Sequence, residues 1–561
     1  MDSAGNAYFL REIMAIIMKN LPSVEKCFLD EDIANKPECS ALTALRGEEV
    51  HYMVAYTMTE AGEECAYTLS TACALPYTVE TVEQVPVYRP CDPQHYDGDY
   101  LRTTPGLYPD LLTPAADGNR IFATSALLAA LYVTVKVPED VSAGEYSVTV
   151  RLMKDGAAAA ETVMPITVLA ATLPKQTIAV TEWFYCDCLA TYYRVPVWSE
   201  EHWALIGKYL QTAVDNGINT ILTPIFTPPL NASVGVNGPT VQLIDVEKTV
   251  DGWKFGFARF ERWVEVCRST GVEYFEIAHL FTQWGAEHAP KIMATVGGVE
   301  EKVFGWETDS LSEEYITFLR AFLTAFTEKL RALGIADRCF FHISDEPGFQ
   351  HMERYRAVKA AISDILTDYP IMDALSNFEF YQTGTVTNPI PSTDHIEPFL
   401  EAEVPGLWTY YCCGQAVDVS NRYVAMPSSR TRVIGMQLWK YKIAGFLQWG
   451  YNFWYEIFSL RPINPYLVTD GGMYVQAGDC YAVYPGEDGT PRTSLHMKAF
   501  TEALTDLRAM RLAESLVGRE AVLSAMEEGL DAPVTFAKYP RDPAYVTTVR
   551  ERVNALIASA L

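Results

Sequence analysis

The chain has 561 residues, of which 49% are hydrophobic and 20% charged, and its formal net charge at pH 7 is -28. This length exceeds what one hydrophobic core usually supports, so two or three domains are expected, and the composition is that of a chain that folds throughout. The strong negative charge, without any cluster of lysine and arginine, argues against nucleic acid and against a membrane surface as partners.

The first residues of the chain do not have the layout of a secretory signal peptide. Charged residues interrupt the first apolar stretch, and no run of 18 or more apolar residues occurs anywhere. Twelve cysteines are scattered without a C-x-x-C pair, which predicts reduced thiols and no metal site. We therefore expect a cytoplasmic protein without a cofactor, although removal of a leader would leave the same sequence.

Residues 45–175 have the pattern of β-strands. Apolar and polar residues alternate over 50–56, 131–137 and 146–152, and turn-forming Pro, Gly and Asp residues separate these segments. Short alternating strands joined by turns are typical of an antiparallel β-sandwich. We predict such an accessory domain over residues 1–175.

From about residue 176 the pattern changes to helices that end at a glycine and are followed by a short apolar strand. Helices are predicted over 202–216, 257–270 and 311–333, each followed by a glycine that favours the left-handed helix cap. Strands that alternate with helices imply parallel pairing through right-handed crossovers.

Seven strands are predicted in this region, and an eighth is expected near residues 385–396. The seven lie at 178–185, 218–222, 272–277, 339–343, 371–375, 407–411 and 446–449. Seven or eight such units without a glycine-rich dinucleotide fingerprint favour a closed (β/α)8 TIM-like barrel over a doubly wound sheet. We expect the α/β barrel over 176–488 and a C-terminal helical appendage over 489–561.

The strongest local motif is Ser344-Asp345-Glu346-Pro347, directly after the apolar strand at 339–343. Pro347 lacks a backbone donor and favours extended geometry at Glu346, so the two acids are expected at the carboxyl end of the strand. Barrel enzymes place catalytic groups at that end. In the alternative interpretation, Ser344 or Asp345 only caps a helix that continues through residues 352–365.

Aromatic and amide residues follow several of the other predicted strands. A sugar ring has apolar C–H faces and many hydroxyls, so a sugar site needs flat aromatic walls together with hydrogen-bonding groups. Ordinary core packing is the alternative interpretation for each of these side chains. The candidates for substrate binding are His279, Trp284, Tyr410, Tyr411, Trp439, Trp449, Asn452 and Trp454.

These segments together resemble glycoside hydrolase family 123, the β-N-acetylgalactosaminidases. The resemblance is carried by residues 105–110 near the N-terminus and by 187–190, 280–286, 344–347, 408–413 and 445–454 in the predicted barrel. The pair Asp345 and Glu346 also resembles that of the family 20 hexosaminidases. The likeness covers most of the chain and is more specific for the catalytic domain than for the sugar.

The resemblance implies a retaining exo-hydrolase of terminal β-linked N-acetylhexosamine, with N-acetylgalactosamine foremost, acting on an oligosaccharide or glycoconjugate. In such substrate-assisted catalysis, Glu346 would protonate the leaving oxygen while the 2-acetamido oxygen attacks the anomeric carbon and forms an oxazolinium ion. Asp345 would orient the acetamide N–H and stabilise the positive charge. Adjacent carboxyls disfavour double ionisation, and Glu346 is expected to hold the shared proton.

Two other interpretations stay open at this point. A two-carboxylate glycosidase could use Glu346 as acid with a distant partner such as Glu456 or Glu379. A non-catalytic carbohydrate-binding protein could use the same barrel without turnover. A substrate that lacks the 2-acetamido group separates the two enzyme mechanisms, and the Glu346→Gln variant separates an enzyme from a binding protein. The sequence does not set the oligomeric state.

Overall fold

The computed structural model describes residues 16–59, 64–230, 232, 235–236 and 238–561. Residues 1–15, on which part of the leader prediction rests, lie outside it. The chain divides into two compact units. The first holds the described residues of Met1–Gln84, Leu112–Leu173 and Asn554–Leu561, and the second those of Val85–Leu111 and Pro174–Val553. Among all these residues, no helix is both long and apolar enough to cross a bilayer.

The first unit is rich in β-structure, with two five-stranded sheets of order β1-β3-β8-β5-β6 and β2-β10-β9-β4-β7. The strands are β1 (Ile16–Pro22), β2 (Leu42–Arg46), β3 (Glu49–Met58), β4 (Glu64–Cys73), β5 (Tyr77–Val87), β6 (Gly106–Pro114), β7 (Arg120–Thr124), β8 (Ala129–Lys136), β9 (Gly144–Lys154) and β10 (Ala157–Thr172), and a short helix η1 (Ile33–Asn35) follows β1. The three strands predicted from alternation are β3, β8 and β9. The pairing of β2 with β10 is parallel, which the antiparallel prediction did not include.

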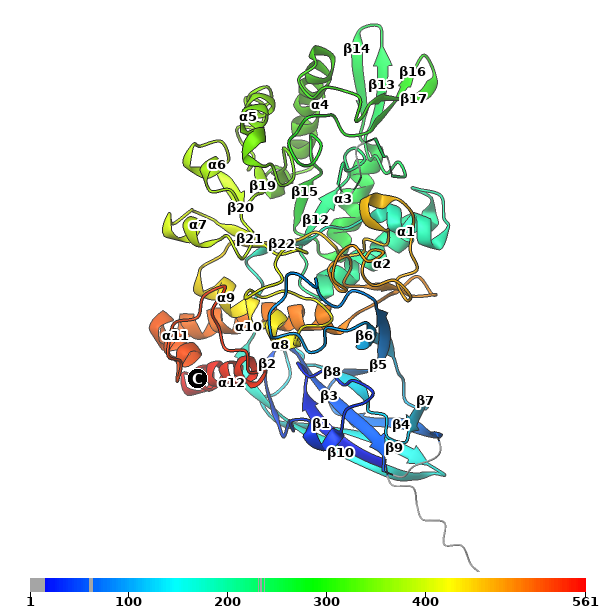
Figure 1. Cartoon of the computed structure of the whole chain (residues 1–561), viewed down its shortest axis with the longest axis vertical. Helices are drawn as coiled ribbons and strands as arrows, with labels where there is room; N and C mark the ends of the chain where they lie inside the picture. Colours follow the sequence, from blue (N-terminus) through cyan, green and yellow to red (C-terminus); the bar gives the residue numbers. More distant parts are fainter. Residues whose placement is uncertain (1–15, 60–63, 231, 233–234, 237) are drawn as a thin grey trace, which may run out of the picture. The chain divides into compact units, whose positions relative to one another are not determined.

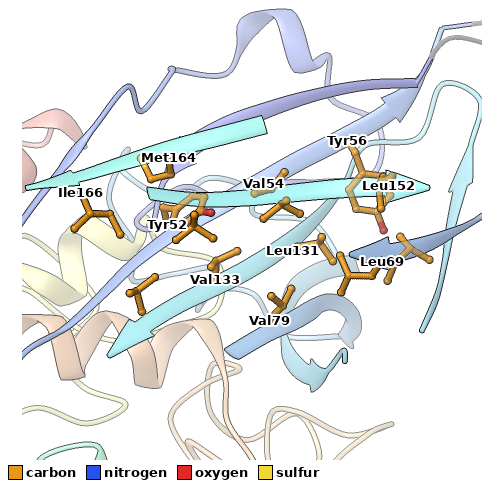
Figure 2. Close-up of a cluster of buried hydrophobic side chains, with 14 of the residues drawn as sticks. Tyr52, Val54, Tyr56, Leu69, Val79, Leu131, Val133, Leu152, Met164 and Ile166 are labelled. Carbon is orange, nitrogen blue, oxygen red and sulfur yellow. The ribbon is translucent and has the colours of Figure 1, made fainter. Parts of the chain in front are cut away.

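One hydrophobic cluster joins the strands of both sheets in this unit. Figure 2 shows Tyr52 and Val54 of β3 and Val133 of β8 together with Leu69 of β4 and Leu152 of β9. These side chains are almost fully buried. The residues that alternate in the sequence therefore point one apolar face of each sheet into a common core.

The second unit contains a six-stranded parallel sheet of order β18-β15-β12-β11-β22-β21 and a separate parallel pair, β19-β20. Their bounds are β11 (Ala179–Glu182), β12 (Thr220–Thr223), β15 (Tyr274–Ile277), β18 (Cys339–Phe341), β19 (Met372–Ala374), β20 (Asn388–Ile390), β21 (Trp408–Tyr410) and β22 (Gly445–Gln448). Single parallel bridges join Phe341 to Ile371 and Ser392 to Tyr410, so the pair is linked to both edge strands of the sheet. All seven predicted strands are confirmed, and β20 is the eighth.

The predicted helices are confirmed as α2 (Glu200–Asp215), α3 (Ala258–Thr270) and α4 (Glu313–Ala332). The glycines that follow them have φ of 88°, 92° and 65°, the left-handed conformation expected of such caps. The other helices of this unit are α1 (Cys186–Tyr193), η2 (Ala336–Arg338), η3 (Phe349–His351), α5 (Met352–Ala360), α6 (Glu379–Gln382), α7 (Glu397–Glu401), α8 (Ser428–Arg432), α9 (Ile434–Lys440), η4 (Ile457–Ser459), α10 (Leu495–Val517) and α11 (Arg519–Glu527), with α12 (Ala544–Ser559) at the C-terminus. In Figure 1, helices α4 to α7 lie outside the strands that they connect.

A four-stranded sheet of order β14-β13-β16-β17 was not predicted. The hairpin of β13 (Asp245–Thr249) and β14 (Gly252–Gly256) stands between β12 and α3, and that of β16 (Ile292–Val296) and β17 (Val299–Phe304) stands between β15 and α4. All four strands are short, and β13 and β17 contain several charged, exposed residues, so the hairpins lack the sustained apolar alternation that marks a half-buried strand. A short hairpin of β23 (Tyr484–Pro485) and β24 (Pro491–Arg492) precedes α10.

Segments from both ends of the chain pack inside the second unit. Oδ1 of Asp110 lies 2.7 Å from Nδ1 of His496, and Oδ2 accepts a hydrogen bond from the Tyr484 hydroxyl. On α10, Asp506 pairs with Nε of Arg432 at 2.7 Å. Residues 85–111, which lie within the first predicted domain, therefore group with the second unit. None of the twelve cysteines, all within the described residues, forms a disulfide.

Candidate active site

Asp345 and Glu346 stand in the turn that follows β18, at the carboxyl edge of the parallel strands. The backbone N–H groups of Ile343 and Ser344 donate to Oδ1 of Asp373 at 3.0 and 3.2 Å. The Ser344 hydroxyl donates to the carbonyl of Thr282 at 2.8 Å. The turn is thus held on one side by Thr282, which follows β15, and on the other by Asp373, which belongs to β19.

The capping interpretation and the extended geometry predicted for Glu346 are both wrong. Helix α5 begins only at Met352, and no side chain caps it. Glu346 has a φ of 43°, in the left-handed region, and its N–H donates to the carbonyl of Ala374 at 3.0 Å. A non-glycine residue in this conformation is strained, and such strain is found at functional sites where the surrounding contacts impose it.

The two acids differ in exposure. Asp345 is half-buried, whereas Glu346 is exposed. Burial raises the pKa of Asp345 well above its ordinary value, and the charge of Glu346 raises it further, while His342 acts in the opposite direction. The expectation that one acid of the pair has a raised pKa therefore holds for Asp345. That Glu346 holds the proton of the pair stays a prediction.

Tyr410 at the end of β21 contacts this pair directly. Its hydroxyl donates to Oε1 of Glu346 at 2.6 Å, and the tyrosine is almost fully buried. Burial raises the pKa of Tyr410, and Glu346 raises it further, so the hydroxyl keeps its proton and remains a donor. The structure thus brings Tyr410 together with the predicted acids.

A buried network of Glu276, His342 and Asp373 lies next to the pair. Nε2 of His342 is 2.8 Å from Oε1 of Glu276, and Nδ1 is 3.4 Å from Oδ1 of Asp373. Burial lowers the pKa of His342, but the hydrogen bonds and charges of the two carboxyls outweigh it and raise the pKa to about 10. The sequence analysis missed Glu276 and Asp373, and the signal that could have found them was a single acid inside an otherwise apolar strand.

His279 lies beside this network rather than at the surface. Its ring stacks on that of His342 with centroids 4.5 Å apart, and neither ring nitrogen has a hydrogen-bond partner among the described residues. Burial lowers its pKa well below the usual range, and the charge of His342 lowers it further.

His279, His342 and Asp373 offer ligand atoms within 4.8 Å of one another. Because Nε2 of His342 lies 2.8 Å from Glu276 and Nδ1 lies 3.4 Å from Asp373, the carboxyl neighbours of His342 are explained without an ion, and we assign no metal to the cluster.

Two tryptophans of the predicted set reach the same edge. Trp284 is 42% exposed, and its backbone N–H donates to the carbonyl of Asp345 at 2.8 Å. Trp449 is half-buried, and its indole N–H donates to Oδ2 of Asp479 at 3.0 Å. Both line a cavity of about 40 Å³ together with Phe453, Phe458, Gly471, Tyr474 and Cys480. This cavity has room for about one water molecule, so a sugar would lie outside it, against the exposed face of Trp284.

A second buried polar cluster supports Trp449. Burial raises the pKa of Asp479 to about 7, although Arg422 and the indole of Trp449 act in the opposite direction. The guanidinium of Arg422 donates to Glu182 at 2.8 Å and to Gln448 at 2.6 Å. The sequence analysis missed these residues as well, because Asp479 and Arg422 lie in loops without a recognisable motif.

Besides the buried His279, the structure does not bring four further predicted binding residues to the exposed edge. Tyr411 is buried, with its ring against Phe446. Asn452 is buried, and its side-chain amide bonds both the N–H and the carbonyl of Tyr185. These two residues shape the interior behind the edge rather than a sugar wall.

Trp439 and Trp454 are also core residues. The indole N–H of Trp439 on α9 donates to Glu514 at 2.9 Å. Trp439 lies next to Ala444, the residue before β22, and therefore at the opposite end of the strands from Asp345. Trp454 is 2% exposed, donates its indole N–H to the carbonyl of Val483, and packs against Tyr192 and Tyr209.

Trp454→Ala is therefore expected to destabilise the protein rather than to weaken sugar binding alone. Removing a buried tryptophan of this size costs about 3–5 kcal/mol in the free energy of unfolding. Thermal unfolding of the full chain checks this, with Trp284→Ala as the matched control, because its exposed ring should leave the unfolding temperature nearly unchanged. An unaltered unfolding temperature in Trp454→Ala would contradict the core placement.

The partner acids of the two-carboxylate interpretation make no hydrogen bond or ion pair with Glu346 within the described chain. Glu456 pairs with Nε of Arg461 at 2.6 Å, and Glu379 is exposed on α6. The acids that the structure gathers around the turn are Asp345, Asp373 and Glu276.

Comparison with known proteins agrees with this geometry. Residues 183–513, more than half of the chain, match the family described as "Glycoside hydrolase 123, catalytic domain". No curated protein gives a significant match. A family 123 glycoside hydrolase from Clostridium perfringens, analysed for glycolipid glycan hydrolysis, superposes with a TM-score of 0.74 at 13% identity, over 97% of this chain and 99% of its own.

Two other solved structures are much less similar. A family 5 xyloglucanase from Bacteroides ovatus has a TM-score of 0.30 at 9% identity and covers 83% of this chain and 98% of its own. A glycoside hydrolase from Bacteroides vulgatus has a TM-score of 0.32 at 8% identity and covers 85% of this chain and 79% of its own. The matched catalytic domain includes Asp345, Glu346 and Tyr410 and covers more than half of the chain: this chain belongs to glycoside hydrolase family 123.

Proposed function

We propose that this glycosidase removes terminal β-linked N-acetylhexosamine, with N-acetylgalactosamine as the preferred sugar, by retaining, substrate-assisted catalysis. The observation that carries the proposal is the pair of unlike acids, an exposed Glu346 bonded by Tyr410 and a half-buried Asp345. An exposed acid can reach a leaving oxygen, and a more buried carboxylate can hold an acetamide N–H. We also propose that the eight strands, joined by the two single bridges, form a closed (β/α)8 barrel, and that the two sheets of the first unit form a β-sandwich.

The chemistry of each step follows from these side chains. Glu346 donates its proton to the glycosidic oxygen as the C–O bond breaks, and the carbonyl oxygen of the substrate's acetamide forms the new bond to the anomeric carbon. Asp345 accepts a hydrogen bond from the acetamide N–H and stabilises the positive charge of the oxazolinium ion. Glu346, now a carboxylate, takes a proton from water. The water oxygen attacks the anomeric carbon and breaks its bond to the acetamide oxygen, which opens the oxazolinium ring with net retention.

A panel of aryl β-glycosides tests the proposed substrate class. N-acetylgalactosamine and N-acetylglucosamine glycosides are expected to be hydrolysed, with kcat/KM higher for the former, whereas galactosides and glucosides should not be, because they lack the internal nucleophile. Release of the aryl group measures each rate. Hydrolysis of the plain galactoside at a rate similar to the acetamido substrate would favour the two-carboxylate mechanism, and binding without any turnover would favour a carbohydrate-binding protein.

Tyr410→Phe is expected to reduce kcat by about tenfold to a hundredfold, because a hydrogen bond to a charged group contributes about 1.5–3 kcal/mol. The lost hydroxyl orients Glu346 after proton transfer, when the carboxylate is formed. Tyr77→Phe is the matched control, since the Tyr77 hydroxyl also contacts a carboxylate, Oδ2 of Asp117 at 3.3 Å, in the first unit. Equal rates in Tyr410→Phe and Tyr77→Phe would exclude a role for Tyr410.

A further inference from the structure

The carboxyl groups of Glu346, Asp373 and Glu276 all act electrostatically on the carboxyl of Asp345. The groups that face Asp345 electrostatically are Glu346, His342, Asp373 and Glu276, and His342 is the one among them that can carry positive charge. Three negative neighbours oppose ionisation of Asp345, whereas the proposed reaction needs Asp345 as a carboxylate. Something must therefore offset their charge.

The imidazole of His342 is placed to do so. Glu276 on β15 lies 2.8 Å from Nε2, Asp373 on β19 lies 3.4 Å from Nδ1, beyond a good hydrogen bond, and the third neighbour, His279, stacks on the ring face. The ring is 2% exposed, so water does not screen it.

The two carboxyls are themselves held in place. Oε1 of Glu276 accepts the indole N–H of Trp183 at 2.8 Å, and Oδ2 of Asp373 accepts the hydroxyl of Tyr355. The same Asp373 accepts the backbone N–H groups of Ile343 and Ser344, the two residues before Asp345. The network therefore fixes both the charge beside Asp345 and the path of the turn that carries it.

We propose that His342 is a buried imidazolium, held by Glu276 and Asp373, that serves as the countercharge of Asp345 and is thus a positioning residue of the reaction. The inference rests on the proposed function in one respect, the need for an ionised Asp345. The raised pKa of His342, to about 10, is consistent with it: burial lowers that pKa, and the two carboxyls more than restore it.

The charge state of His342 can be measured without reference to activity. The full chain, labelled with ¹⁵N in its nine histidines, is expected to show one histidine that keeps protons on both ring nitrogens at pH 8. Asp373→Asn should shift that pair of signals and identify it as His342, since the signals of the other carboxyl-paired buried histidine, His496, should stay in place. If no histidine whose signals respond to Asp373→Asn keeps both ring protons at pH 8, the inference is overturned, whatever glycosides the protein hydrolyses.

The pH profile of kcat/KM on an N-acetylhexosaminide tests the effect on Asp345. His342→Gln is expected to move the acidic limb upward, with the apparent acid dissociation constant falling at least about tenfold, because a nearby opposite charge lowers a carboxyl pKa by about 1–3 units. His51→Gln is the control, since His51 is a buried histidine of the first unit, bonded to Thr134.

A folded His342→Gln variant with a lower kcat but an unmoved acidic limb would reduce His342 to a structural residue. A wild-type protein that does not hydrolyse N-acetylhexosaminides would refute the proposed function. The ¹⁵N result would still decide the charge of His342.

Discussion

Glu346→Gln is expected to lower kcat for an N-acetylhexosaminide by about 100- to 10,000-fold, the range typical of general acid catalysis. Glutamine preserves the shape of the side chain and can still accept the Tyr410 hydroxyl on its amide oxygen, so the turn should stay in place. It cannot give a proton to the leaving oxygen. The loss should therefore be larger for a poor leaving group such as an alkyl alcohol than for an acidic phenol, which departs without protonation.

Glu379→Gln and Glu456→Gln are the matched controls for this experiment. Each makes the same chemical change at an acid that forms no hydrogen bond or ion pair with Glu346 in the described part of the chain, and each acid is a candidate partner in the two-carboxylate mechanism. Wild-type rates in both, together with a large loss in Glu346→Gln, are expected. Activity of Glu346→Gln within tenfold of wild type would remove Glu346 from the mechanism, and a large loss in either control would revive the second carboxylate.

Asp345→Asn is expected to lower kcat by about 100- to 1,000-fold, similar to the loss of one preorganised group that stabilises a charged transition state. The amide can still contact the acetamide, but it brings no negative charge to the oxazolinium ion. KM should change less than kcat, because the lost interaction is strongest in the transition state. An unchanged kcat would show that Asp345 does not stabilise the developing charge.

The same variant is expected to be more stable than the wild type at neutral pH. Burial raises the pKa of Asp345 in the folded protein above its value in the unfolded chain. Ionisation therefore penalises the folded state, and the free energy of unfolding falls as the pH rises from the unfolded pKa through the folded one. The gain in unfolding temperature of Asp345→Asn should shrink towards zero below about pH 4. Lower stability of the variant at pH 7 would contradict the burial of this carboxyl.

The sequence predicted those parts of the fold that depend on local pattern. Apolar periodicity and glycine caps located seven parallel strands and three long helices, since each signal lies within one short segment. The hairpins β13–β14 and β16–β17 were not predicted because their strands are short, β13 and β17 contain several charged residues, and the strands are ordered by pairing with each other. The grouping of residues 85–111 with the second unit depends on contacts such as that of Asp110 with His496, which no local pattern encodes.

The candidate site was predictable to a similar extent. The motif at 344–347 marked the two acids, because a strand that ends in adjacent acids and a proline is unusual. The backbone of Glu346 was predicted wrongly, since the contact of its N–H with Ala374 outweighs the preference imposed by Pro347. Aromatic residues near strand ends were a weak guide: Tyr410, Trp284 and Trp449 reach the edge, but Trp454 and Trp439 are core residues.

The central claim is that the acetamide of the substrate supplies the nucleophile. It can be tested most directly with a series of aryl 2-acetamido-β-glycosides whose acetyl methyl group carries zero, one, two or three fluorines. Fluorine withdraws electrons from the carbonyl oxygen and leaves the position of the sugar nearly unchanged, so kcat is expected to fall steeply with each added fluorine. A kcat that stays constant across the series would show that a protein carboxylate, not the acetamide, attacks the anomeric carbon.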